Sequence, residues 1–244
     1  MRVGNSAGFA GRVLGKVAAL AGMLVLVAAC QANGSKAFDP LKLPVTQARI
    51  VLMPMDVELV ELSAAGMPEP KADWTEAARR YLDTSFAAEQ KERGLTFVPF
   101  DESKASPQVA DTLHQLQKLH LKVGEAAMLH HYVPVAQLPA KGGAFDWTLG
   151  PSARALKEAT GADYALFVLV RDSYSSAERK ALIVAAALFR VSVPGGVQLG
   201  FASLVDLETG KVVWFNRLLN GTGDLRDAAP ARETAKQLLA GFPQ

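Results

Sequence analysis

The chain contains a single cysteine, Cys30, and the residues around it point to a chemical use for its thiol. It follows Val27, Ala28 and Ala29, a branched apolar residue and two small ones that fit a narrow peptidase site. A lone cysteine cannot form an intramolecular disulfide. Because a thiol can form a stable thioether, covalent modification of Cys30 is the chemistry that this residue offers.

Residues 1–29 have the plan of a secretory signal peptide. The charged residues among them are Arg2, Arg12 and Lys16, and an uncharged stretch of apolar and small residues follows from 17 to 29. A positive end before an apolar segment is typical of such peptides. The stretch is shorter than the roughly 20 residues that cross a bilayer core, so a permanent transmembrane anchor is the weaker interpretation.

The sequence Val27-Ala28-Ala29-Cys30 resembles the lipobox of bacterial prolipoproteins. This resemblance implies lipidation of Cys30, with acyl chains that hold the mature chain on a membrane. In Gram-negative lipoproteins an aspartate after the cysteine tends to retain the protein in the inner membrane. Gln31 therefore indicates the outer membrane, on its periplasmic face. The alternative is an ordinary signal peptide that ends beside a buried cysteine.

Loss of residues 1–29 changes the charge balance of the chain. The formal net charge is +2, and removal of the three cations of the signal peptide leaves −1 for residues 30–244. A basic surface for nucleic acid is therefore not supported. Glycines and prolines after Cys30 predict a flexible tether over 30–48, followed by one domain over 49–244 that is long enough to bury a core.

Three patterns that could carry chemistry lack the context that they need. Gly4 to Gly8 matches the GxSxG pattern around Ser6, but that pattern works in a strand-to-helix turn, and here it lies in the signal peptide. The glycines at 195, 196 and 200 lack a phosphate-binding pattern. The histidines, which are His114, His120, His130 and His131, show no metal-ligand spacing. We therefore assign no catalytic residue, metal or cofactor.

The sequence Arg171-Asp172-Ser173-Tyr174 follows a predicted central strand, where open α/β sheets often bind ligands. Simple loop polarity explains these residues better, because position in a fold does not establish function. The alternative is a periplasmic hydrolase whose site joins Asp172, Ser173 and one histidine. A pocket that holds these groups together would favour it.

Apolar periodicity predicts the elements that must position these residues. The run at 162–170 is apolar enough to be a strand covered on both faces, and Leu207 to Gly210 has the signature of a hairpin turn. A capping box from Asp73 to Glu76 predicts a helix start, and Ser106-Pro107 predicts another. The remaining expected strands are 50–55, 95–100, 198–206 and 211–217, and the remaining expected helices are 150–161 and 230–239.

The segment between the predicted strands at 162–170 and 198–206 is expected to begin as a polar loop, 171–179. Residues 181–189 are apolar on all sides, and their alanine content favours a buried helix over a strand. If a docking surface exists, the 181–193 segment and the hairpin with Trp214 and Phe215 are the first choices. Strand alternation is expected to place one of these two aromatic residues in the core.

The order of elements, the entry Gly161-Ala162-Asp163-Tyr164 into a strand and the hairpin 203–214 resemble the envelope lipoproteins related to CsgG, LpoB and the amino-terminal domain of TolB. The resemblance covers roughly residues 49–240. It implies a compact α/β domain used for docking or assembly in the periplasm. No pair of long amphipathic segments of the kind that CsgG-type pore hairpins need is evident, so no secretion channel is expected.

Together these observations predict an α/β protein with one domain, in which helices flank a mixed central sheet in three layers. The expected function is that of a non-catalytic interaction or envelope-assembly factor, anchored through Cys30. The expected partners are the membrane, an envelope protein and a possible second copy of the chain.

Overall fold

The computed structural model describes residues 34–37, 41, 44–45, 47–221 and 224–243. The strands among them are β1 (Gly34–Ala37), β2 (Ile50–Leu52), β3 (Asp56–Leu62), β4 (Pro68–Pro70), β5 (Phe97–Pro99), β6 (Tyr164–Ser175), β7 (Gln198–Asp206) and β8 (Val212–Asn220). The α-helices are α2 (Ala72–Arg93), α3 (Pro107–Tyr132), α4 (Arg154–Thr160), α5 (Ala177–Leu188) and α6 (Ala228–Leu238).

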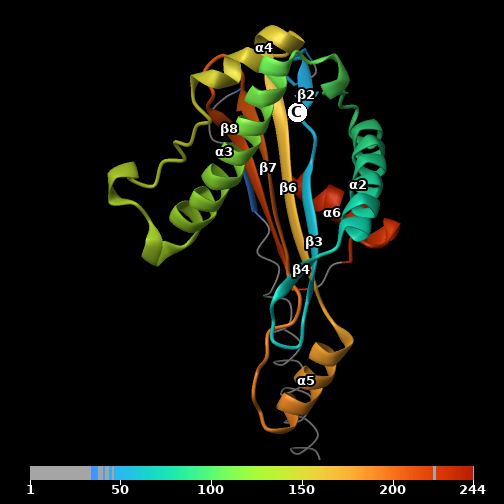
Figure 1. Ribbon diagram of the computed structural model, residues 1–244. Coiled ribbons are helices and arrows are strands. Elements are labelled where there is room, and N and C mark those ends of the chain that lie inside the picture. The colour runs from blue at the N-terminus through green and yellow to red at the C-terminus, as the bar shows by residue number, and fades with distance from the viewer. Residues whose placement is uncertain (1–33, 38–40, 42–43, 46, 222–223, 244) are drawn as a thin grey trace, which may run out of the picture. The chain divides into compact units, whose positions relative to one another are not determined.

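Within this described part, eight strands form one mixed sheet (Figure 1). The main path runs β1-β8-β7-β6-β2-β5, and β3 pairs with the part of β6 that lies beyond β2. β6 is parallel to β2 and β3 but antiparallel to β7, and β8 and β1 continue the antiparallel part. β6 is therefore the strand at which the parallel and antiparallel halves meet.

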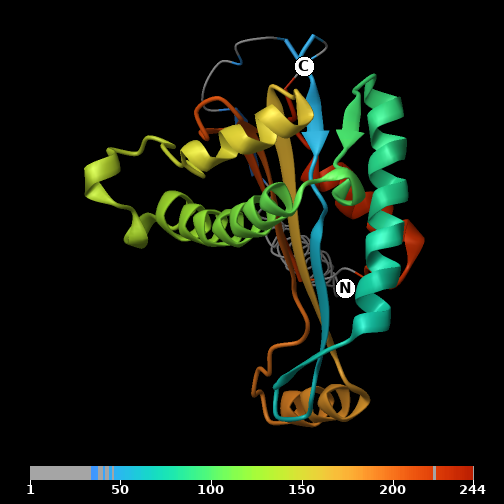
Figure 2. The same ribbon diagram turned by 45° about the horizontal axis from the view of Figure 1, so that its top comes forward.

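Helices cover both faces of this sheet (Figure 2). Leu166 and Val168 of β6 share a core with buried residues of α2 and α6, whereas Phe167 and Leu169 share a second core with α3 and α4. Because side chains alternate along a strand, burial on both faces requires the nearly unbroken apolar run that β6 has. The predicted α/β class, with a mixed sheet between helices, is confirmed.

Some of the helix ends follow local sequence signals. Gly94 ends α2 with φ 65°, a left-handed conformation that glycine adopts without a steric penalty. The Ser106 hydroxyl accepts a hydrogen bond from the Val109 amide at 3.3 Å and so caps α3, as predicted. The predicted capping box at the start of α2 is wrong. The capping position is Lys71. Asp73 lies inside the first turn, where its negative charge interacts favourably with the positive end of the helix dipole.

The prediction of a polar loop at 171–179 is also wrong, because β6 continues to Ser175. β3 pairs with this extension from Asp56, opposite Leu169, to Leu62, opposite Ser175. The partner strand supplies the hydrogen bonds that make the polar sequence extended. β3 also forms a hairpin with β4, and neither strand is among those expected from the sequence.

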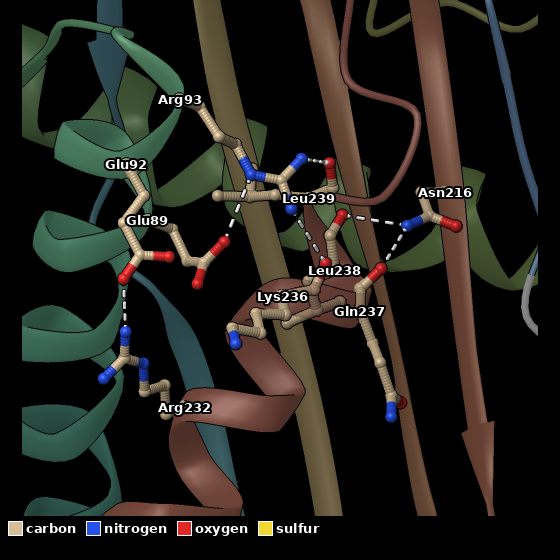
Figure 3. A network of polar contacts seen from close by, with 9 residues as sticks. All are labelled: Glu89, Glu92, Arg93, Asn216, Arg232, Lys236, Gln237, Leu238 and Leu239. Atoms are coloured by element: carbon tan, nitrogen blue, oxygen red, sulfur yellow. Dashed lines mark hydrogen bonds and ion pairs between the residues drawn. The ribbon is translucent and has the colours of Figure 1, made fainter.

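The carboxyl end of α6 is fixed by side chains from two other elements (Figure 3). The side-chain amide of Asn216 on β8 donates to the carbonyls of Gln237 at 2.6 Å and Leu238 at 2.9 Å. The Arg93 guanidinium at the end of α2 donates to the Leu239 carbonyl at 2.7 Å. These donors satisfy carbonyls that a helix end leaves without partners in the helix.

Part of the segment predicted as a tether belongs to the described residues. Residues 34–37 form β1, which pairs with β8 in the register Gly34 to Arg217 and Ala37 to Trp214. Val45 is buried in the core that contains α2 and α6. The start of the domain at Arg49 stays a prediction, and Cys30, Gln31 and residues 1–29, with Ser6, lie outside the described residues.

Candidate docking surface

The chain between β6 and β7 forms a projection that we call the α5 extension, residues 176–197. The Ser176 hydroxyl caps α5 by accepting a hydrogen bond from the Arg179 amide at 3.2 Å. In both views α5 lies beyond the end of the sheet (Figures 1 and 2). The predicted helix over 181–189 is thus confirmed, except that α5 ends at Leu188.

Arg179 ties the α5 extension to the turn between β3 and β4. Its side chain is 8 % exposed, and its guanidinium donates to the Pro194 carbonyl at 2.7 Å and to the Ala64 carbonyl at 3.4 Å. At Gly66 in that turn, φ is 82° and a Cβ would lie 2.8 Å from Arg179 Nη1. The guanidinium therefore fits against backbone on both sides and holds α5 in one orientation.

The predicted burial of 181–189 is wrong, because the apolar side of α5 faces solvent. Val184 is 66 % exposed, and Leu188 and Phe189 are each 80 % exposed. Ala181, Val184, Ala185 and Leu188 follow the helical spacing of a core-facing stripe, yet all four are exposed. The physical reason is the position of α5, which lies past the end of the sheet, where no other layer of the described residues covers it. Contiguous exposed apolar surface of this kind marks interaction sites.

The other proposed docking residues, Trp214 and Phe215, are both buried, at 0 % and 1 % exposed. They lie on opposite faces of β8, and helices cover both faces of the sheet. The indole of Trp214 donates to the Gly241 carbonyl at 2.8 Å, and the Phe215 ring stacks on Phe201. The two aromatic residues are therefore core residues.

A buried polar network supports the root of the α5 extension. The Tyr174 hydroxyl donates to Asp172, and Gln198 donates to the same carboxylate at 3.1 Å. The Leu225 amide donates to the Tyr174 oxygen at 2.9 Å. Burial raises the pKa of Asp172, against the effect of these donors. Burial, followed by the hydrogen bond to Asp172, also raises the pKa of Tyr174, which stays protonated and able to donate.

The structure does not bring Asp172, Ser173 and a histidine together in one pocket, as the hydrolase alternative requires. Asp172 and Ser173 line a pocket of about 210 Å³, and no histidine is among its lining residues. As neighbours on one strand, they point to opposite faces of the sheet. The Ser173 hydroxyl is engaged with Val197, whose amide donates to it at 2.8 Å.

His120 lies in the core between the rings of Phe167 and Phe201. Its Nε2 is 2.9 Å from the Ser203 hydroxyl oxygen, and burial lowers the pKa of the imidazole to about 3. His120 is therefore a neutral core residue at physiological pH. His114 is exposed, and His130 Nδ1 is 2.7 Å from the Ala136 carbonyl.

The part of the chain that the structure describes holds no group of three or more His, Cys, Asp or Glu residues arranged to bind a metal. In the same residues, no helix has the length and apolar character needed to cross a membrane. A larger pocket of about 520 Å³ lies beside β5, where sequence patterns gave no signal. Its Lys104 is paired with Asp101 at 2.7 Å.

No family model matches this chain, and no curated protein matches it. Solved structures match it at low similarity. A PelC dodecamer from Paraburkholderia phytofirmans is 12 % identical with a TM-score of 0.38, over 85 % of this chain and 96 % of that one. Lipoprotein GNA1162 from Neisseria meningitidis is 15 % identical with a TM-score of 0.30, over 80 % and 99 %.

The LpoB C-terminal domain from Salmonella enterica is 12 % identical with a TM-score of 0.29, and the match covers 73 % of this chain and 85 % of that domain. The structural neighbours thus include LpoB, one member of the group named from the sequence, and a lipoprotein. All of these TM-scores lie below 0.5, so the similarities do not determine a function for this chain.

Proposed function

We propose that this protein is a lipoprotein held at the periplasmic face of the outer membrane through Cys30, where it acts as a non-catalytic interaction or envelope-assembly factor. The observation that carries the interaction role is the α5 extension. An apolar helix surface that is exposed beyond the sheet lowers the solubility of a protein. Its presence is explained if another surface covers it in the functional state.

Support for the anchor comes from residues 1–31. The cations, the apolar stretch, the two alanines and the single cysteine agree in type and order with a prolipoprotein. Two or more acyl chains on one residue hold a protein stably on a membrane, since each buried methylene contributes about 0.8 kcal/mol. Gln31 supports the outer membrane as the destination.

Support for a non-catalytic role comes from what the buried polar groups do. Asp172 and Tyr174 bind the Leu225 amide and Gln198, and His120 packs against two phenylalanine rings. These groups hold loops and helices onto the sheet. An envelope protein, or a second copy of the chain, completes the proposed set of partners.

Membrane fractionation in a Gram-negative host tests this proposal. Wild type, Cys30→Ala and Gln31→Asp would be expressed as full precursors, and inner and outer membranes would be separated on a density gradient. We expect wild type in the outer membrane, Gln31→Asp shifted to the inner membrane, and Cys30→Ala lost from the processed membrane-bound pool. Wild type and Cys30→Ala with the same distribution would refute the anchor.

A further inference from the structure

We propose that the α5 extension lies on the lipid surface itself, with Val184, Leu188 and Phe189 at the level of the headgroups and upper acyl chains. This inference rests on the proposed lipid anchor and adds a second contact with the same membrane. The membrane would then cover the exposed side of α5, and the two contacts would set the orientation of the domain relative to the membrane.

The shape of the apolar surface fits a lipid layer. Arg179, Ile183 and Ala186 form the side of α5 that is buried or half-buried against the rest of the domain. The opposite side carries Val184 and Leu188, and Phe189 directly follows the helix. The exposed apolar residues therefore form a convex surface on the side of α5 that faces away from the domain. A helix that lies in the membrane plane presents such a side to the acyl boundary.

The charges of the extension favour an anionic lipid surface. From Arg179 to Val205 the chain has no aspartate or glutamate, and its exposed cations in that stretch are Lys180 and Arg190. Glu178, in the first turn of α5, is the one acidic residue of the extension. Apolar residues flanked by cations are the composition of helices that bind the interface of anionic membranes.

The direction of β1 shows toward which end of the sheet the preceding chain leaves. β1 is antiparallel to β8, with Ala37 opposite Trp214 and Gly34 opposite Arg217. The chain that leads back from Gly34 therefore leaves toward Asn220. Asn220 is opposite Gln198, the residue at which the α5 extension returns to the sheet.

Cys30 precedes Gly34 by four residues. Four residues span at most about 14 Å when fully extended. A lipid on Cys30 would therefore be attached within that distance of Gly34, at the strand end that leads toward Asn220, and one membrane plane could accommodate both contacts.

A site-specific fluorophore tests this proposal on the processed protein. Because Cys30 is the only cysteine and its thiol is consumed by lipidation, Leu188→Cys introduces a single reactive thiol for a polarity-sensitive dye. Leu188 is 80 % exposed, so the fold should tolerate the change. Val135→Cys is the matched control, since Val135 is 96 % exposed and lies outside the α5 extension. Both proteins would be reconstituted into vesicles of phosphatidylethanolamine and phosphatidylglycerol.

We expect the dye at position 188 to shift its emission to shorter wavelength and to lose most of its intensity when the vesicles carry nitroxide groups on their acyl chains. The dye at position 135 should do neither. No shift at 188 would overturn the proposal. A shift without nitroxide quenching would also overturn it, because a second copy of the chain would then cover α5. Intact mass of the same samples reports Cys30 separately, so failure of the anchor and failure of the α5 contact are distinguishable.

Discussion

Replacing Arg179 with alanine should release the α5 extension from the turn between β3 and β4. The change removes the hydrogen bond to the Pro194 carbonyl at 2.7 Å and the longer one to Ala64 at 3.4 Å. A hydrogen bond from a charged group contributes about 1.5–3 kcal/mol, and the long bond adds little. Since 1.4 kcal/mol corresponds to a factor of ten, local opening should become about 10- to 150-fold more frequent.

Amide hydrogen exchange read by mass spectrometry measures this opening directly. Peptides that cover 177–191 should exchange faster in Arg179→Ala by that factor, while peptides from β6 and β7 should change little. Lys180→Ala is the matched control, because Lys180 is the exposed neighbour of the buried arginine. Equal exchange of 177–191 in Arg179→Ala and wild type would refute the role of Arg179 as an anchor.

Three further predictions concern the core, and urea unfolding measures each. Gly124→Ala should lower the free energy of unfolding by about 1–2 kcal/mol. The added Cβ would lie 2.1 Å from the Phe201 ring, and the cost of overpacking is larger than the gain in helix propensity. Unchanged stability would contradict this contact. Asn216→Leu should cost about 2–4 kcal/mol, because the carbonyls of Gln237 and Leu238 lose their donor, and a loss under 0.5 kcal/mol would show that they do not depend on it. His120 binds its proton less readily in the folded state, with a pKa near 3 against 6.5, so wild type should lose about 1 kcal/mol per pH unit from pH 6.5 downward toward pH 3. His120→Gln should show a flatter pH dependence over that range, and equal slopes would exclude His120 as the cause.

Local signals in the sequence were enough to predict the centre of the fold. The apolar run of β6 could be recognised because a strand covered on both faces cannot alternate. The hairpin between β7 and β8 was predicted from the turn Leu207 to Gly210, and Gly94 and Gly161 end helices in left-handed conformations at φ 65° and 64°. In each case a few adjacent residues determine the backbone.

Features that depend on distant partners were not predictable in this way. The polar end of β6 is extended because β3, more than a hundred residues earlier, pairs with it. The apolar side of α5 looked like core because periodicity reports that a side chain is apolar and not what covers it. Of the two segments proposed for docking, 181–193 is largely exposed and the aromatic residues of β8 are buried, and this difference required the structure.

The anchor at Cys30 is the central claim, and the intact mass of the purified mature protein tests it most directly. We expect wild type to begin at Cys30 and to carry a mass increment equal to a diacylglyceryl group with further acylation, and we expect Cys30→Ala to lack that increment. If the masses of wild type and Cys30→Ala differ only by the substituted side chain, the claim is contradicted. The chain would then be an ordinary secreted protein.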